Sequence, residues 1–264
     1  MLNPAKILNP ANMLNKVPEI TLTFWIIKIM STTVGETGAD YLAVHVGLGT
    51  AITGGIMLAL LIAALLMQLR PRQYVPWLYW LTVVLVSVVG TQITDALTDG
   101  LDVSLYASTT IFGLMLAATF AIWYSVERTL SIDSIVTTRR ELFYWAAILF
   151  TFALGTAAGD LATEALYLGF NVGVLAFGAL IAVLAGVYYL GANAVLTFWF
   201  AYILTRPLGA SLGDLLSQSQ PNGGVGLGTV KTSIAFLAVI ASLVIYLSIG
   251  PNAPKSRPKT IEQG

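Results

Sequence analysis

A tryptophan followed ten residues later by a glycine and fifteen residues later by an aspartate occurs four times in this chain. The tryptophans are Trp25, Trp80, Trp145 and Trp199, the glycines Gly35, Gly90, Gly155 and Gly209, and the aspartates Asp40, Asp95, Asp160 and Asp214. Successive tryptophans lie 55, 65 and 54 residues apart, and no insertion separates a tryptophan from its aspartate. Self-similarity of this kind is typical of a repeat architecture. The fold therefore has to contain four equivalent units.

Each copy of the motif lies in an apolar stretch long enough to cross a bilayer. Hydrophobic residues make up 57% of the chain and charged residues only 10%, which is outside the range of soluble globular domains. Windows of about 20 apolar residues predict eight membrane-spanning helices, near 20–42, 47–69, 75–98, 105–127, 141–165, 168–190, 193–216 and 228–249. The predicted fold class is an all-α, polytopic membrane bundle with internal fourfold or twofold pseudosymmetry. Its four tandem helical-hairpin repeats cover approximately 19–70, 75–128, 140–190 and 193–249.

Charged residues in the loops predict the orientation of the bundle. Lysine and arginine lie before the first span, between spans two and three, between spans four and five, and after span eight, whereas the opposite loops carry only acidic charges. By the positive-inside rule, both termini are predicted to be cytoplasmic. Residues 1–18 then form a cytoplasmic N-terminal segment, 19–249 the transmembrane domain, and 250–264, with three prolines, a disordered cytoplasmic tail.

The charge balance and the missing cysteine exclude several classes of function. The chain has 13 basic and 13 acidic residues and no basic face, so no nucleic acid partner is expected. Without cysteine, disulfides, thiolate metal sites and cysteine nucleophiles are all excluded. Because it also lacks the His-Glu-x-x-His and Gly-x-Ser-x-Gly motifs and a phosphate-binding loop, we expect that the protein is not an enzyme.

Two parts of each motif are predicted to be structural. Residues four apart share a helix face, and small residues at that spacing let helices approach closely in lipid. Such pairs begin at each motif glycine: Gly35 with Ala39, Gly90 with Thr94, Gly155 with Gly159, and Gly209 with Gly213. The four tryptophans Trp25, Trp80, Trp145 and Trp199 are predicted to anchor their helices at the membrane interface.

A polar stripe runs along each motif helix in steps of four residues. It consists of Lys28, Thr32, Glu36 and Asp40; Ser87, Thr91, Asp95 and Asp99; Phe152, Thr156, Asp160 and Glu164; and Arg206, Ala210, Asp214 and Gln218. A carboxylate at membrane depth costs roughly 2.5–3.5 kcal/mol at a helix centre, so such residues turn away from lipid. The four stripes are therefore predicted to face one another around a polar interior or a water-filled cavity.

Acidic residues outnumber basic ones within the spans, and protons or a cation must balance them. The predicted ion-binding and translocation residues are Glu36, Asp40, Asp95, Asp160 and Asp214, together with Thr32, Thr91 and Thr156. Asp99, Glu164 and His45 are assigned to an outer vestibule, although a lone histidine at a helix end is more often an interfacial residue. Carboxylate and hydroxyl ligands suit hard ions such as Mg²⁺, Mn²⁺, Ca²⁺ or Na⁺, and Glu36, Asp40, Asp95 and Asp160 form the candidate metal-binding set.

Basic side chains inside the spans are expected to form internal ion pairs. Arg206 is predicted to pair with Glu36, which lies at a similar height in the first repeat, and Lys28 and Lys231 are expected to pair with other acids. Pro207, which follows Arg206, favours a kink. A permanently open cation pore would be obstructed by Arg206. An alternating-access carrier tolerates such an ion pair better than a channel does.

The first repeat resembles a known family. Lys-Val-Pro-Glu-Ile-Thr-Leu-Thr-Phe-Trp-Ile-Ile-Lys at 16–28, followed by Thr-Thr-Val-Gly-Glu-Thr-Gly-Ala-Asp at 32–40, is similar to bacterial membrane proteins built of four tandem two-helix repeats with a characteristic tryptophan. The resemblance covers residues 16–249. It implies the fold and the bacterial inner membrane but no substrate, because that family is a domain of unknown function.

These patterns predict a multi-pass transporter for a small cation, either a divalent metal or an ion coupled to protons or Na⁺. The expected partners are the lipid bilayer and the cation, with a bound metal ion or Na⁺ but no covalent cofactor, and the oligomeric state is left open. The alternative is a non-transporting membrane scaffold or sensor, in which the aspartates only hold the bundle together.

Overall fold

The computed structural model describes residues 15–45 and 50–249, except for the side chains at positions 40, 42–45, 164 and 165. Within these ranges the chain forms eight α-helices: α2 (Leu22–His45), α3 (Thr50–Gln68), α4 (Pro76–Thr98), α5 (Leu105–Glu127), α6 (Thr138–Asp160), α7 (Gly169–Tyr189), α8 (Ala194–Ser217) and α9 (Thr229–Ile249). A π-helical turn, Leu161–Ala165, extends α6. A helix lies at each of the eight predicted positions, and the helix ends lie within three residues of the predicted ones when the π-helical turn is counted with α6. Most of the two predicted terminal segments, 1–18 and 250–264, lies outside the description.

Local sequence signals explain where several helices begin. The side chain of Asn193 accepts hydrogen bonds from the backbone amides of Val195 and Leu196 and so caps α8. Ser104 and Thr137 cap α5 and α6 in the same way, and Pro76 occupies the first turn of α4, where its missing amide hydrogen is not needed. Pro207 lies inside α8 without ending it.

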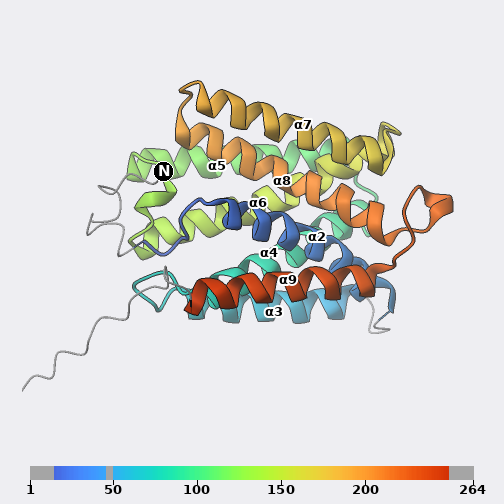
Figure 1. The fold of residues 1–264 in the computed structure, drawn as a ribbon, viewed down its shortest axis with the longest axis horizontal. Helices are drawn as coiled ribbons and strands as arrows, with labels where there is room; N and C mark the ends of the chain where they lie inside the picture. Colours follow the sequence, from blue (N-terminus) through green and yellow to red (C-terminus); the bar gives the residue numbers. More distant parts are fainter. Residues whose placement is uncertain (1–14, 46–49, 250–264) are drawn as a thin grey trace, which may run out of the picture.

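The four motif helices α2, α4, α6 and α8 form a closed ring at the centre of the molecule. α2 packs on α4, α4 on α6, α6 on α8, and α8 returns to α2. Burial separates this ring from the helices around it: 50–61% of the span residues of α4, α6 and α8 are buried, against 6–17% of those of α3, α5, α7 and α9. Figure 1 shows the helices lying side by side, with α7 at one edge and α3 and α9 at the other.

The outer helices interlock the repeats. The second helix of each repeat packs mainly on the motif helix of the next repeat: α3 on α4, α5 on α6, α7 on α8 and, closing the circle, α9 on α2. The two helices of one repeat follow each other as a hairpin along the chain but touch each other less. No repeat therefore buries its own apolar face without its neighbour.

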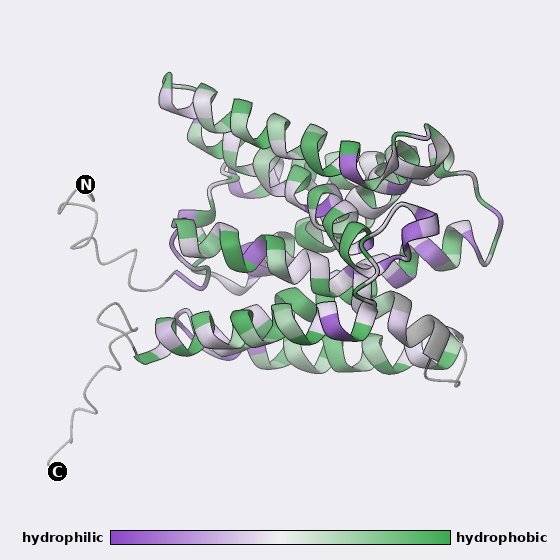
Figure 2. Cartoon of the chain, turned by 45° about the vertical axis from the view of Figure 1, so that its right-hand side comes forward, coloured by the Kyte–Doolittle hydropathy of each residue, from purple (hydrophilic) through white to green (hydrophobic). Residues whose placement is uncertain are grey.

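The distribution of apolar side chains fits a multi-pass membrane protein. Seven of the eight described helices are long and apolar enough to cross a membrane. The exception is α2, which carries Lys28 and Glu36 and packs against α4, α8 and α9. In Figure 2 the outer helices are largely hydrophobic, whereas the most hydrophilic residues lie on the inner helices and at the helix ends.

The motif glycines are the points of closest approach in the ring. A methyl group added at Gly35 would overlap Ser87, and one at Gly209 would overlap Thr32. At Gly90 it would lie 2.7 Å from Cβ of Phe152, and at Gly155 it would lie 2.5 Å from Cβ of Arg206. Each glycine thus faces the residue seven places after the tryptophan of the next repeat. The predicted packing role is confirmed for these four glycines, and Gly159 and Gly213 extend the same contacts toward Pro207 and Glu36.

Replacing a motif glycine should open one seam of the ring. Gly209→Ala is expected to lower stability by about 1–3 kcal/mol, because overpacking forces neighbouring groups apart. The measurement is the thermal unfolding midpoint of the detergent-solubilised protein. Gly178→Ala on α7 is the matched control, since an added methyl there meets open space. Equal losses of stability in the two variants would show that close packing at Gly209 is not what stabilises the ring.

Candidate functional site

Equivalent residues of the four repeats meet in layers on the axis of the ring. Seven places after each tryptophan lie Thr32, Ser87, Phe152 and Arg206, and eleven places after it lie Glu36, Thr91, Thr156 and Ala210. All eight side chains are buried. The predicted polar stripes therefore face one another, as the spacing of four residues required.

Arg206 belongs to the first of these layers, and its guanidinium reaches into the second. Its Nη2 donates to Glu36 Oε2 at 2.6 Å, to Thr156 Oγ1 at 2.8 Å and to Thr91 Oγ1. Its Nη1 donates to the backbone carbonyl of Thr32 at 3.4 Å. A single guanidinium on α8 thus binds α2, α4 and α6, and it is fully buried. The predicted Arg206–Glu36 ion pair is confirmed.

The second internal base does not form the ion pair predicted for it. Lys28 is fully buried, and its Nζ lies 3.9 Å from the ring centroid of Phe152 and 4.2 Å from that of Tyr202. It is absent from the four ion pairs formed by the described residues. Because Glu36 bonds to Arg206, Lys28 is left to the aromatic faces, which attract a cation electrostatically. Lys231 is exposed and is likewise absent from these ion pairs.

A cavity of about 940 Å³ lies beyond Arg206, toward the ends of the motif helices that carry the aspartates. Five of the predicted acidic residues line it: Glu36, Asp95, Asp99, Asp160 and Asp214. Gln92, Gln218, Thr50, Thr53 and Thr98 add further polar groups. No lysine, arginine or histidine is among the described residues that line this cavity. One acidic chamber therefore receives side chains from all four motif helices.

Among the described residues, the acids predicted to bind a metal ion are not grouped around one point. Within residues 15–45 and 50–249, no three histidine, aspartate or glutamate side chains are grouped closely enough to hold a metal ion. Glu36 is bonded to Arg206, and Asp95 and Asp160 lie on different helices around a wide chamber. The side chains of Asp40, His45 and Glu164 lie outside the description. Thr91 and Thr156, expected to line an ion path, are acceptors for the guanidinium instead.

The tryptophans close the opposite end of the ring rather than anchoring it in lipid. Trp80, Trp145 and Trp199 are buried and so do not face lipid as an interfacial anchor would, whereas Trp25 is half-buried. The rings pack against other aromatics that start the motif helices, such as Phe24 and Phe198 against Trp25. They face neighbouring helices because each helix of a closed ring has protein on two sides.

Tyrosine side chains are part of this aromatic layer, and their hydroxyl groups form hydrogen bonds within it. Tyr79 and Tyr144, each one residue before a motif tryptophan, are fully buried and share a hydrogen bond of 2.5 Å. Trp80 Nε1 donates to the hydroxyl of Tyr74 in the loop that precedes α4. Burial raises the pKa of this Tyr74 hydroxyl above its usual range.

One contact at this end was missed by the sequence analysis. Lys16, one of the basic residues before the first predicted span, is buried and lies 2.5 Å from Glu141 of α6. It also donates to the carbonyl of Leu69 at 3.1 Å. These contacts hold the segment before α2 against the tryptophan end of the ring. A carboxylate at the start of an apolar span was the available signal.

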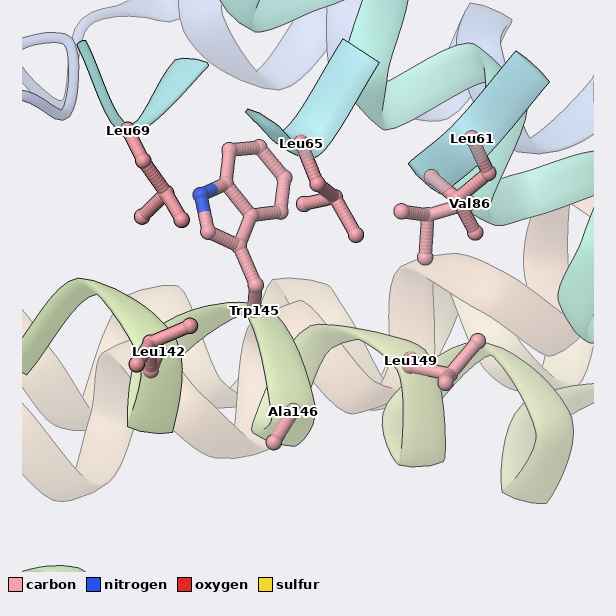
Figure 3. Close-up of a pocket in the computed structure, with 8 residues that line it drawn as sticks. All are labelled: Leu61, Leu65, Leu69, Val86, Leu142, Trp145, Ala146 and Leu149. Carbon is pink, nitrogen blue, oxygen red and sulfur yellow. The ribbon is translucent and has the colours of Figure 1, made fainter. Parts of the chain in front are cut away.

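A second, smaller cavity lies on the side of the bundle. It measures about 180 Å³ and is lined by Leu61, Leu65, Leu69, Val86, Leu142, Trp145, Ala146 and Leu149. In Figure 3, Trp145 projects from α6 between Leu65 of α3 and Leu69, the residue that follows α3. This lining is apolar, so it offers little to a charged or polar molecule, and the acidic cavity is the candidate site.

Breaking the axial ion pair should reveal how much it stabilises the ring. Arg206→Ala leaves Glu36 without its partner and is expected to destabilise the solubilised protein by about 3–5 kcal/mol. Adding Glu36→Gln should recover much of that loss in the same melting assay. Arg139→Ala, which removes an exposed partner of Glu127, is the control and should cost less than about 1 kcal/mol. If the double variant is no more stable than Arg206→Ala, loss of the ion pair with Glu36 is not the cause of the destabilisation.

Comparison with known proteins places these repeats in one family. No curated protein and no solved structure matches the chain. The family model described as Repeat of Unknown Function (DUF347) matches residues 23–74, 78–129, 143–192 and 197–249. These four matches agree with the predicted repeats and cover most of the sequence. The chain therefore belongs to the DUF347 family and carries four tandem copies of its repeat.

Proposed function

We propose that this protein transports a small cation across the membrane through the acidic cavity. The observation that carries the proposal is the lining of that cavity: five carboxylates, contributed by all four motif helices, with no basic side chain among the described lining residues. A cleft lined by one sign of charge with apolar walls concentrates ions of the opposite sign. A positively charged solute is thus the ligand that this chamber favours.

The distribution of the carboxylates bears on the kind of cation. They surround a wide chamber and do not converge on one point among the described residues. Such an arrangement suits an ion that keeps part of its water shell, as Mg²⁺ does when a protein holds it through one or two carboxylates. Hard ions with oxygen ligands, such as Mg²⁺, Mn²⁺, Ca²⁺ or Na⁺, remain the proposed cargo.

Arg206 favours a gated carrier over an open channel. The guanidinium fills the axis directly below the cavity and bonds to three other helices. Lys28 and the aromatic layer follow beneath it. A cation moving along the axis has to release Glu36 from Arg206, so passage requires the ring to rearrange. Since this role involves no bond making, we propose a carrier and not an enzyme.

The same hydrogen bonds support a second candidate function. A guanidinium that ties four helices together also suits a scaffold or sensor whose polar core serves only assembly. In that case the acidic cavity would bind a cation without passing it through the membrane. A flux measurement separates the two functions.

Removing single carboxylates should slow transport. In proteoliposomes assayed with Mg²⁺, Mn²⁺, Ca²⁺ and Na⁺, Asp95→Asn, Asp160→Asn and Asp214→Asn are each expected to reduce uptake of the transported ion by roughly tenfold or more, because each weakens the local attraction. Asp133→Asn, in an exposed turn away from the cavity, is the matched control and should retain wild-type uptake. Variants that fold and transport as the wild type does would favour the scaffold.

We also propose that the cavity lies on the outer side of the bacterial inner membrane, with both termini cytoplasmic. The loop after α4, whose Asp99, Gly100 and Leu101 line the cavity, has no lysine or arginine, whereas the loop before α4 carries Arg70 and Arg72.

The orientation can be tested directly because the chain contains no cysteine. Leu101→Cys, at an exposed position, should react with a membrane-impermeant thiol reagent added to intact spheroplasts. Arg72→Cys, also exposed, should react only after the membrane is permeabilised. The reverse pattern of labelling would show that the cavity faces the cytoplasm.

A further inference from the structure

Lys28 is a buried basic side chain for which the transport mechanism above has no use. It has no exposed surface, and its Nζ has no hydrogen-bond partner among the described residues. A buried ammonium without a counter-ion is costly. Two aromatic faces at 3.9 and 4.2 Å offset only part of that cost, since a cation–π contact is weaker than an ion pair with a buried carboxylate.

Lys28 and Arg206 share one neighbour. The guanidinium carbon of Arg206 lies 6.0 Å from the Phe152 ring centroid, on which Lys28 also rests, and the two charges repel each other. Arginine stays protonated in proteins, whereas lysine can exist as a neutral amine. The repulsion on Arg206 therefore changes whenever Lys28 gains or loses its proton.

The other groups around Lys28 leave it as the base that can change charge. From α8 it faces Tyr202 and Arg206, and the nearby hydroxyls of Tyr79 on α4 and Tyr144 on α6 are bonded to each other. The titratable side chains of α9 are Lys231 and Tyr246, both exposed, and α3 carries none. No described carboxylate lies within ion-pair distance of its Nζ.

We propose that Lys28 is a proton-binding site that couples cation transport to proton movement. The inference rests on the proposed transport function. A proton from the aqueous phase at the tryptophan end binds the neutral amine and makes it an ammonium. The added positive charge pushes on Arg206 and weakens its bond to Glu36. Loss of the proton restores the bond. Proton binding at Lys28 is thus linked, through two neighbouring side chains, to the Arg206–Glu36 bond that has to open for the cation to pass.

The test measures cation uptake and proton movement in the same vesicles. Proteoliposomes containing pyranine, a pH-sensitive dye, receive magnesium, manganese, calcium or sodium chloride, and cation uptake is followed in parallel. Wild type and Lys231→Met, the matched control at an exposed lysine, should show uptake together with a pH change. Lys28→Met should lose the pH change and slow uptake, because a neutral side chain cannot weaken the Arg206–Glu36 bond. Lys28→Met with an unchanged pH response would overturn the proposal.

Two additions keep the outcome decisive. Lys28→Arg is measured beside Lys28→Met, and serves alone if Lys28→Met does not fold, because a permanently charged side chain keeps the Arg206–Glu36 bond weakened and should retain uptake while abolishing the pH change. If wild type takes up no cation, the transport function fails, and melting temperatures at a series of pH values then decide about Lys28 alone. A gap between wild type and Lys28→Met that varies with pH supports a proton site. Parallel curves reject it.

Discussion

In lipid no hydrophobic force draws one apolar helix to another, so the central ring depends on close backbone contact at Gly35, Gly90, Gly155 and Gly209. Each contact lies against the residue seven places after the tryptophan in the next repeat. That geometry brings the polar stripes of four helices onto a common axis. The outer helices reinforce it, because each one covers a motif helix of the following repeat.

The axis formed in this way is polar but not symmetric. A layer of Glu36, Thr91 and Thr156 offers three side-chain oxygens to a cationic group, and the fourth repeat supplies that group as Arg206. The guanidinium pairs with the buried carboxylate of Glu36 and also donates to the hydroxyls of Thr91 and Thr156, which themselves donate to the carbonyls of Ser87 and Phe152. It also divides the interior, because carboxylates line the cavity on one side of it and aromatic rings fill the other.

The sequence alone was sufficient for features governed by regular helix geometry. The period of four residues predicted the inward stripes and the glycine seams, and similar height along two helices predicted the Arg206–Glu36 pair. Features that depend on which helices become neighbours were not predictable. Depth along the membrane does not show whether Trp80 faces lipid or protein, nor that Arg206 binds Glu36 while Lys28 lies against two aromatic rings. The contact of Lys16 with Glu141 joins residues 125 apart and leaves no local pattern.

The head-to-tail pairing of repeats has a consequence for how such a ring could be built. An interface in which one unit grips the next closes after four units, so separate two-helix subunits with this pairing would assemble as a cyclic homotetramer. Every subunit would then bring the same side chain to the centre, and four guanidiniums would crowd one small site. When the four units are joined in a single polypeptide, they no longer have to carry the same side chain. This lets one copy diverge and lets one arginine serve the whole ring.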